Sequence, residues 1–471
     1  MFFLIYALLL SSVTNAEMRT SFVQLFEWPW ADVARECEVY LGPNGFAAVQ
    51  ISPPQESLAW PGNPWWTRYQ PVSYTIFSRS GDESEFVNML QRCKRAGVDV
   101  YVDAVINHMA GVDSGYGVMG TPFTHYNYPG LYGFSDFHHC GRNGNNDIVN
   151  FFDLWEVQNC ELVNLADLAT ESPKVRKTLT SYLQRLLDLG ASGFRIDAAK
   201  HIPPEDLNAI LSPLSTNYSF FELLKGPGEP IPVNDYLSIS DVTASAYPFL
   251  VSERFTSGSL RDLPSVPSFL PSTEKSVVFL ENHDYERLFD LRDQLLSYRE
   301  EPELFRLAQI FMLTWPFGYP QIYSGYHFGS YNEAPPMASN NRVASVFDAN
   351  GNCTGRWLCQ HRLPEIPALI RFRNRLYNEF YVSSLFYFQD HLFGFTRGNS
   401  GLVLINKSSQ KYRVSVNTNL PPGGYCVIHE NGASAKYSSD SCLRKYNISS
   451  NSPSVFELLP TSAIVLIREG L

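Results

Sequence analysis

The amino-acid sequence predicts an α/β fold: a (β/α)₈ TIM barrel with a subdomain inserted after strand 3 and an antiparallel β domain at the C-terminus. Short apolar runs alternate with amphipathic helical patterns over roughly the first 350 residues, which is typical of repeated βα units. A doubly wound sheet would show the same alternation, but no glycine-rich phosphate loop follows any of the predicted strands. We therefore predict a closed barrel.

The predicted barrel strands are short apolar runs, separated by segments long enough to hold a helix. They are residues 22–28, 46–53, 98–108, 193–197, 219–224 and 276–284. A helix is predicted at 82–97, where apolar side chains recur on one face, and another at 172–190, which begins with Ser-Pro and ends at Gly190. A helix that leads into a strand through a glycine turn is half of a βαβ unit, whose strand is normally buried.

Two stretches depart from this alternation. Residues 109–166 are rich in Gly, Asn, His and Tyr and are too long for an ordinary loop, so we predict an inserted subdomain. From about residue 376 the helical patterns give way to alternating apolar and polar residues, typical of antiparallel strands. The predicted division is a signal peptide at 1–16, a barrel at 17–107 and 168–375, an inserted subdomain at 108–167 and a C-terminal β domain at 376–471.

The N-terminal segment and the composition indicate a secreted protein. Residues 2–10 are apolar but too few to span a bilayer as a helix, and cleavage is predicted after Ala16, although no Lys or Arg precedes the run. The formal net charge of −11 argues against nucleic acid and anionic membranes as partners. Sequons for N-glycosylation are compatible with secretion. They begin at Asn217, Asn352, Asn406 and Asn447.

Charged residues are concentrated in GFRIDAAKH, residues 193–201. Side chains two apart on a strand share a face, so Arg195 and Asp197 point the same way. A lone Arg-x-Asp is more often a solvated surface pair, but this strand follows a predicted helix and is expected to be buried, where charges need partners or a function. Two other predicted strands carry the acids Glu222 and Asp284 at their ends. A closed barrel brings such ends to one face, and three acids there suggest glycosidic chemistry.

Four motifs occur in order along the chain: DAVINH (103–108), GFRIDAAKH (193–201), FELL (221–224) and FLENHD (279–284). Together with LFEWPW, NPWWTRYQPVSY (63–74) and NLADLA (164–169), they resemble the secreted animal members of the α-amylase family of glycoside hydrolases. The resemblance covers nearly the whole chain after the predicted signal peptide and is strongest before residue 285. It implies retaining endo-hydrolysis of α-1,4-glucosidic bonds in starch, glycogen and related glucans.

By motif position, the resemblance implies that Asp197 is the nucleophile, Glu222 the acid and base, and Asp284 a residue that holds sugar hydroxyls and favours the distorted ring. Arg195 would lower the pKa of Asp197, and neighbouring carboxylates would raise that of Glu222. The residues implied to contact substrate come from an aromatic loop, from histidines beside the acids and from two cations. For the aromatic residues the alternative is packing in the core, for the histidines a structural role, and for Lys200 solvation at the surface. These residues are Trp65, Trp66, Tyr69, Gln70, His108, Arg195, Lys200, His201 and His283.

The resemblance also implies a calcium site that joins the barrel to the inserted subdomain. All of its donors would be oxygen atoms, which suit a hard cation. The ligands would be the side chains of Asn107 and Asp167 and the main-chain carbonyls of Gln158 and His201.

Other features of the animal enzymes are altered in this chain. Their chloride ion is bound by two arginines and an asparagine; Arg195 and Asn282 match, but His327 replaces the second arginine, and a neutral histidine binds an anion poorly. Glu281 stands where aspartate is usual. After Asp284 the chain reads YERLFDLRDQLLSYREEP, where the animal enzymes carry a flexible glycine-rich loop, so the products or the activity are expected to differ.

The eight cysteines, an even number, fit four disulfides in an oxidising compartment. Their spacing favours Cys353 with Cys359 and Cys426 with Cys442, and it leaves the other four unassigned. Zinc is the competing interpretation, but no Cys-x-x-Cys pair occurs. For the remaining cysteines the resemblance implies the pairs Cys37–Cys93 and Cys140–Cys160.

The sequence therefore predicts a secreted, calcium-dependent, endo-acting enzyme of the α-amylase family. We expect a monomer whose partners are starch, glycogen and maltooligosaccharides. An α-glucosidase or transglycosylase of the same family is one alternative. A noncatalytic glucan-binding paralogue is another, suggested by the altered segment after Asp284, but a binder has no need of all three acids.

Overall fold

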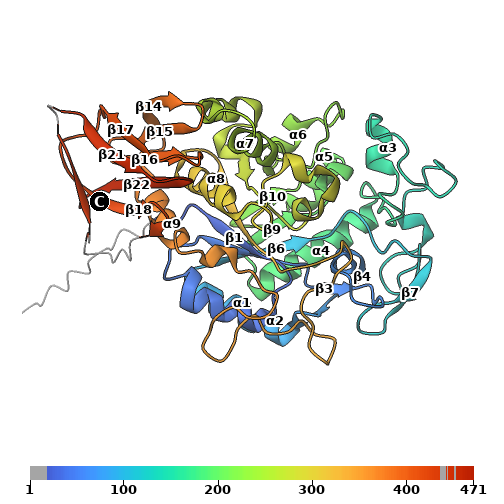
Figure 1. Ribbon diagram of the computed structural model, residues 1–471. Helices are drawn as coiled ribbons and strands as arrows, with labels where there is room; N and C mark the ends of the chain where they lie inside the picture. The colour runs from blue at the N-terminus through green and yellow to red at the C-terminus, as the bar shows by residue number, and fades with distance from the viewer. Residues whose placement is uncertain (1–17, 435–441, 443, 450–451, 471) are drawn as a thin grey trace, which may run out of the picture.

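The computed structural model describes residues 18–434, 442, 444–449 and 452–470, so the predicted signal peptide lies outside the described residues. Parallel strands form a closed barrel at the centre of the molecule, in the order β1-β13-β12-β11-β10-β9-β6-β2 (Figure 1). Their bounds are β1 Phe22–Leu25, β2 Ala48–Ile51, β6 Asp99–Ala104, β9 Gly193–Ile196, β10 Tyr218–Phe221, β11 Asp241–Thr243, β12 Ser276–Val278 and β13 Tyr319–Ser324. The closed barrel confirms the predicted fold class and excludes the doubly wound sheet.

Each of the six predicted strand segments overlaps a barrel strand, but two barrel strands were not predicted. β11 has only three residues, DVT, too few for a periodic signal. β13 reads YPQIYS, and its proline and polar residues obscure its burial inside the barrel. Both strands are nevertheless almost entirely buried, because closure of the barrel covers them from both sides.

The side chains inside the barrel form layers. Apolar and aromatic side chains fill the layer at the amino ends of the strands: Phe22, Ala48, Tyr101, Phe220 and Val277. Two residues further along the strands, the interior becomes polar, with Gln24, Gln50, Asp103, Arg195 and Gln321 all buried. A layer of buried hydrogen-bonding side chains therefore lies below the carboxyl ends of the barrel strands.

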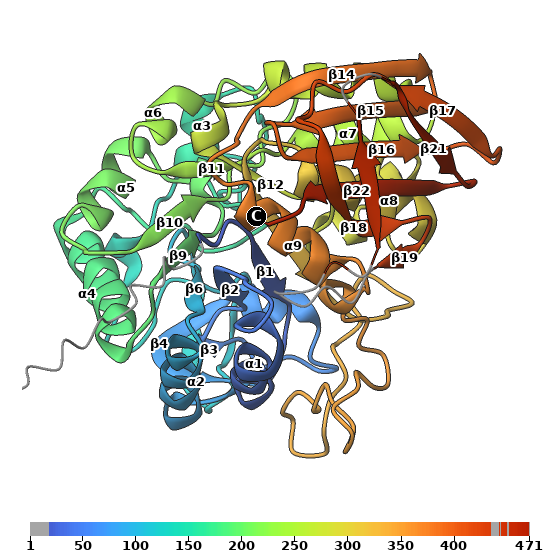
Figure 2. The same cartoon turned by 90° about the vertical axis from the view of Figure 1, so that its left-hand side faces the viewer.

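Helices connect the strands and cover the outside of the barrel (Figures 1 and 2). They are α1 Trp30–Glu36, α2 Glu83–Arg95, α4 Pro173–Leu189, α5 Pro204–Leu211, α6 Val233–Leu237, α7 Tyr247–Phe255, α8 Pro302–Thr314 and α9 Ile366–Arg375. Asp82 and Glu85 form a capping box at the start of α2, and Gly190 ends α4 in the left-handed conformation, at φ 116°. The two helices predicted from periodicity are confirmed.

The segment between β6 and α4 departs from the βα repeat, as predicted. It contains the hairpin β7 Ser114–Tyr116 and β8 Pro122–Thr124, and the short helix α3 Leu154–Asn159. A small antiparallel sheet of β3 Gln55–Ser57, β4 Pro71–Ser78 and β5 Gly81–Asp82 follows β2. Helix α3 and β7 lie at the opposite end of the molecule from the C-terminal β strands (Figure 1).

The C-terminal part is an antiparallel β domain, as predicted. Its main sheet has the order β14-β15-β16-β22-β18-β19, with β20 also paired to β18, and a ribbon of β17 and β21 lies beside it. The bounds are β14 Val382–Gln389, β15 Leu392–Arg397, β16 Gly401–Asn406, β17 Tyr412–Val416, β18 Gly423–Glu430, β19 Ala433–Ser434, β20 Lys445–Ile448, β21 Ser454–Leu458 and β22 Ser462–Arg468.

All four disulfides suggested by the sequence are present: Cys37–Cys93, Cys140–Cys160, Cys353–Cys359 and Cys426–Cys442. Among the sequons, Asn406 is fully buried, and its amide donates to the carbonyls of Gln410 and Leu459. The folded protein therefore does not offer Asn406 for glycosylation. Within the described residues, no helix is both long and apolar enough to cross a membrane.

Candidate active site

The three predicted acids line a single cleft at the carboxyl ends of the barrel strands. Asp197 follows β9, Glu222 follows β10 and Asp284 lies beyond β12. The cleft has a volume of about 480 Å³. Six other residues that were predicted to contact substrate also line it: Trp65, Trp66, Tyr69, Gln70, His108 and His283.

Arg195 lies beneath the cleft and binds three carboxyl groups at once. Its Nη1 is 2.6 Å from Oδ1 of Asp103 and 2.6 Å from Oδ1 of Asp197, and its Nη2 pairs with Glu222. The register between β6 and β9 places Asp103 directly beside Arg195. Because Asp197 and Glu222 contact neighbouring nitrogens of one planar guanidinium, the arginine fixes their positions relative to each other.

The backbone after Asp197 is also bound to Glu222. Ala198 adopts the left-handed conformation at φ 49°, which is costly for a residue with a Cβ. This conformation allows the Ala198 N–H to donate to Glu222 Oε2 at 2.9 Å. The adjacent Ala199 N–H donates to the Glu222 carbonyl at 3.1 Å. The turn therefore connects the ends of β9 and β10 where the two acids emerge.

The carboxyl cluster retains protons more readily than the sequence predicted. Burial raises the pKa of Asp197 well above its usual range; Glu222 and Asp103 add to this effect, and Arg195 opposes it. Burial and Glu222 raise the pKa of Asp284 to about 7. The predicted net lowering of the Asp197 pKa is therefore wrong, because burial of the carboxyl group, together with its acidic neighbours, outweighs the single guanidinium. Arg195 offsets only part of the effect of burial.

His283 is held as a neutral donor toward Asp284. The Gln24 amide donates to His283 Nδ1 at 3.0 Å, so the ring proton is on Nε2, which lies 3.4 Å from Asp284 Oδ2. Burial and two nearby arginines lower the pKa of His283 well below its usual value. The ring is stacked between Phe26 and Tyr69, with centroid distances of 4.9 Å on each side.

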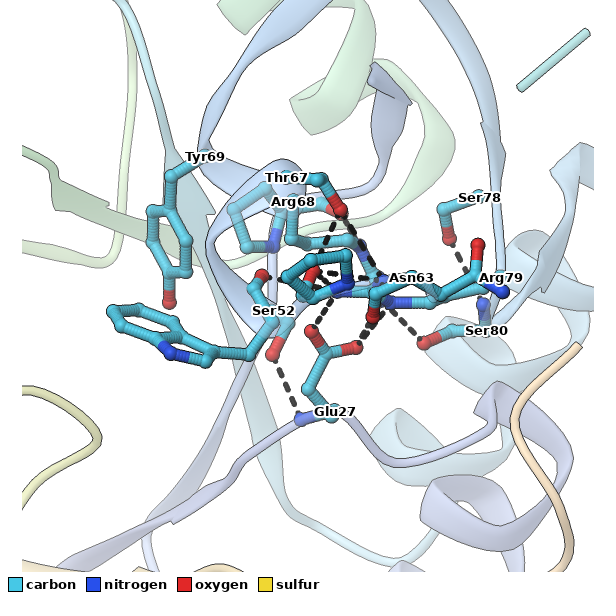
Figure 3. A network of polar contacts seen from close by, with 12 residues as sticks. Glu27, Ser52, Asn63, Thr67, Arg68, Tyr69, Ser78, Arg79 and Ser80 are labelled. Atoms are coloured by element: carbon cyan, nitrogen blue, oxygen red, sulfur yellow. Dashed lines mark hydrogen bonds and ion pairs between the residues drawn. The ribbon is translucent and has the colours of Figure 1, made fainter. Parts of the chain in front are cut away.

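The loop that carries Trp65, Trp66 and Tyr69 is fixed by a buried ion network (Figure 3). Glu27 binds Arg68 at 2.8 Å and Arg79 at 2.5 Å. Burial alone would raise the pKa of Glu27, but the two arginines outweigh burial and hold it below its usual range. Arg79 also donates to the carbonyls of Asn63, Pro64 and Trp65. The aromatic loop is therefore bound to the barrel through Glu27.

The segment after Asp284 is packed against the cleft wall. It forms two 3₁₀ turns, Tyr285–Arg287 and Phe289–Gln294, in place of the glycine-rich loop. Arg287 is buried, pairs with Glu286 and donates to the His283 carbonyl at 2.7 Å. Its guanidinium also lies 4.9 Å from the Trp65 ring centroid. The altered segment therefore supports the residues of the cleft.

Three predicted substrate contacts do not line the cleft: Arg195, which lies beneath it, Lys200 and His201. Lys200 pairs with Glu229 at 3.0 Å, and only 12% of its side chain is exposed. His201 is buried, and its Nδ1 donates to the Val157 carbonyl at 2.8 Å. Burial lowers the pKa of His201 to about 3, so the ring is neutral.

The four residues predicted to bind calcium are all buried where the inserted segment meets the barrel. Asn107 donates to Asp167 Oδ1 at 3.2 Å, and α3, which carries Gln158, packs on the 3₁₀ turn that contains His201. Among the described residues, no group of three or more His, Cys, Asp or Glu side chains is arranged around a metal position. The predicted donors contain only one carboxylate, since an amide and two carbonyls supply the rest.

The structure does not assemble the predicted chloride ligands. Arg195 and Asn282 are buried, and the Asn282 Oδ1 accepts from the backbone N–H of Asp284 and of Tyr285. His327, in contrast, is exposed beyond the end of β13. The assignment of His327 to this site is therefore wrong. The residue of β13 that lies in the polar layer with Arg195 is Gln321.

Some residues of the site were not recognised from the sequence. Asp103 binds Arg195 and accepts from the Tyr69 hydroxyl at 3.0 Å; it is the first residue of the motif DAVINH and a charge inside an apolar strand, but no role was assigned to it. Val163 and Tyr331 line the cleft from distant loops. No periodic pattern marks these loop residues, so only the folded chain brings them to the cleft.

Comparison with known proteins agrees with this architecture. Residues 40–217 match the family model "Alpha amylase, catalytic domain", and residues 388–469 match "Alpha amylase, C-terminal all-beta domain". The chain is 38% identical to the α-amylase of Tenebrio molitor over 452 residues, 91% of this chain and 92% of the relative. It is 36% identical to the α-amylase-related protein of Drosophila melanogaster over 433 residues, covering 87% and 85% of the two chains.

The crystal structure of α-amylase I from Eisenia fetida is 30% identical in sequence, with a TM-score of 0.88 that covers 96% of this chain and 98% of that chain. A variant of the same protein has been crystallised with maltohexaose and matches with the same score and coverage.

Proposed function

The chain belongs to the α-amylase family of glycoside hydrolases, and on this premise we propose that it is an endo-acting enzyme that cleaves α-1,4-glucosidic bonds of starch and glycogen with retention. The observation that supports this proposal is the convergence of Asp197, Glu222 and Asp284 on one cleft. A maltohexaose complex of the Eisenia fetida relative is consistent with a linear α-glucan as the ligand. Four disulfides and the predicted signal peptide support secretion.

Retaining hydrolysis requires a nucleophile and an acid side by side. Arg195 binds Asp197 through Oδ1, so Oδ2 is the oxygen that attacks the anomeric carbon. Glu222 gives its proton to the departing glycosidic oxygen, and a covalent glycosyl-enzyme forms on Asp197. Glu222 then takes a proton from water, which attacks the same carbon and releases the sugar with its original configuration.

The surrounding residues prepare this reaction. Burial raises the pKa of Asp197 and of Asp284, and the Arg195 guanidinium opposes this effect, which favours the ionised form of Asp197 that the attack requires. His283 donates through Nε2 on the side of Asp284, where sugar hydroxyls would accept or share the hydrogen bond. Trp66 and Tyr69 present aromatic rings to the cleft, and the apolar faces of glucose pack well on such rings.

Asn107, Asp167 and the carbonyls of Gln158 and His201 would hold a calcium ion, because all four donors are oxygen atoms from buried residues of two adjoining segments. When bound, the ion would supply a fixed positive charge that joins the inserted segment to the barrel. The adjacent His201 lies three residues after Ala198, so this junction supports the turn that binds Glu222.

The decisive experiment compares the wild type with Asp197→Asn. We expect the wild type to release reducing sugar from starch with retained anomeric configuration, and the variant to lose activity by at least about 10⁴-fold while it still binds starch. Starch binding without hydrolysis by the wild type would instead support a noncatalytic glucan-binding protein. Preference for short maltosides over starch would support an α-glucosidase, and sugar transfer to added maltose would support a transglycosylase.

A further inference from the structure

The inserted segment exposes several large apolar side chains within one short stretch of sequence. Val149, Phe151, Phe152 and Trp155 have exposed fractions of 62, 36, 68 and 50%. We refer to Phe151, Phe152 and Trp155 as the aromatic patch. Clustered apolar exposure of this kind marks a binding surface more often than scattered single residues do. The catalytic mechanism does not use the patch, because none of its residues lines the cleft.

The backbone beneath the patch is held firmly. Glu156, itself buried, accepts hydrogen bonds from the N–H groups of Val149 and Asn150 at 3.0 and 2.9 Å. Asp153 caps helix α3 by accepting from the Trp155 N–H at 3.0 Å. A rigid surface loses little entropy when a ligand binds, so the exposed rings are presented in advance of binding.

The patch also continues from the edge of the cleft. The Lys200 ammonium lies 5.4 Å from the centroid of the Phe151 ring and pairs with Glu229. Lys200 is two positions after Ala198, which lines the cleft. After β10, the segment that begins at Leu224 in the cleft wall leads to Gly228. A Cβ added to Gly228 would lie only 3.1 Å from the Phe152 ring, so the two residues are in contact. Both segments therefore connect the cleft to the patch.

We infer that Phe152 and Trp155 bind the part of a long α-glucan chain that leaves the cleft past Lys200. This inference rests on the proposed function, and it extends the binding surface beyond the residues around the acids. A glucose ring presents an apolar face of C–H groups, which packs on an exposed aromatic ring. A neutral polysaccharide also suits a protein with a net charge of −11, whereas an anionic membrane does not.

The test is the double variant Phe152→Ala/Trp155→Ala, assayed on amylose and on maltotetraose. We expect kcat/KM on amylose to fall about tenfold, the loss expected for two ring contacts of ordinary strength, while kcat/KM on maltotetraose stays unchanged. The aromatic variant Phe152→Tyr/Trp155→Phe should retain wild-type activity on both substrates. Phe269→Ala is the matched control, because Phe269 is 63% exposed on a segment that packs against β15.

Binding is measured separately from catalysis by affinity electrophoresis in amylose gels, with Asp197→Asn as the parent protein. Loss of retardation when Phe152 and Trp155 are replaced supports the inference, even if the wild type proves to be inactive on starch. Equal retardation, or an equal loss of activity on amylose and maltotetraose, overturns it. A concentration-dependent dimer that the double variant disperses in sedimentation would also overturn it, because the patch would then bind a second copy of the chain.

Discussion

Replacement of Glu27 by glutamine tests whether the aromatic loop depends on the buried ion network. Glu27 is completely buried and binds both Arg68 and Arg79, whose side chains are only 1% and 7% exposed. Arg68 also donates to the Pro53 carbonyl at 2.7 Å, so the guanidinium groups connect the loop to the end of β2. Glutamine has nearly the same shape, so the variant removes the charge without opening a cavity.

The expected loss is large because two buried cations would be left without their anion. Removal of one partner from a buried ion pair costs about 3–5 kcal/mol, and here a single carboxylate serves two guanidinium groups, so we expect about 5 kcal/mol. The matched control is Glu38→Gln. Glu38 pairs with Arg92 at the surface, with 37% and 26% of the two side chains exposed, so its loss should cost less than about 1 kcal/mol.

Urea unfolding at pH 7 measures both variants. Glu27→Gln should lower the unfolding midpoint far more than Glu38→Gln, and any folded Glu27→Gln protein should show a raised KM for maltooligosaccharides because Trp65 and Tyr69 are less firmly held. Equal unfolding free energies for the two variants would refute the claim that the network stabilises the loop.

Two further predictions concern pH and calcium. Burial, and after it the charge of Glu286, raises the pKa of Glu281 from an ordinary 4.5 to about 8. Between these two pH values the native state keeps a proton that the unfolded chain has lost. The free energy of unfolding should therefore fall as pH rises from about 5 to 8, by at most about 1.4 kcal/mol per pH unit. Glu281→Gln should make this slope shallower in urea unfolding by the share that Glu281 contributes, because Asp284, with a pKa of about 7, titrates in the same window; parallel pH profiles for wild type and variant would contradict the assignment. Calcium at about 1,000 times its Kd should stabilise the wild type by about 4 kcal/mol, and EDTA should lower its Tm; Asp167→Asn should abolish calcium binding in calorimetric titration, whereas unchanged binding would place the ion elsewhere.

Local patterns accounted for the parts of the fold that carry a strong period or a terminal signal. The helix at 173–189 combines one apolar face with a proline at its start and Gly190 at its end, so it needed no tertiary information. β11 was missed because its three residues are too few to show the alternation of a strand. β13 was missed because its six residues include a proline. Their burial is a property of the closed barrel and has no local signature.

The predicted site shows the same division. The acids were identified by their positions in recognisable motifs, but the assignment of His327 failed because it relied on position in the sequence alone. Gln321 lies in the polar layer instead, since the phase of β13 decides which side chains enter the barrel. The aromatic patch was equally hidden, because exposure depends on what the rest of the chain fails to cover.

The sequence by itself thus determined the order and identity of the motif residues, the alternation of strands and helices, two of the disulfide pairs and the family. The tertiary structure alone decided the net proton affinity of the cluster around Arg195. The pKa of Asp103 and that of Asp197 are each a sum over the effect of burial in the closed barrel and the charges of groups from β6, β9 and β10. Such a sum depends on distances through space, which a linear sequence does not contain.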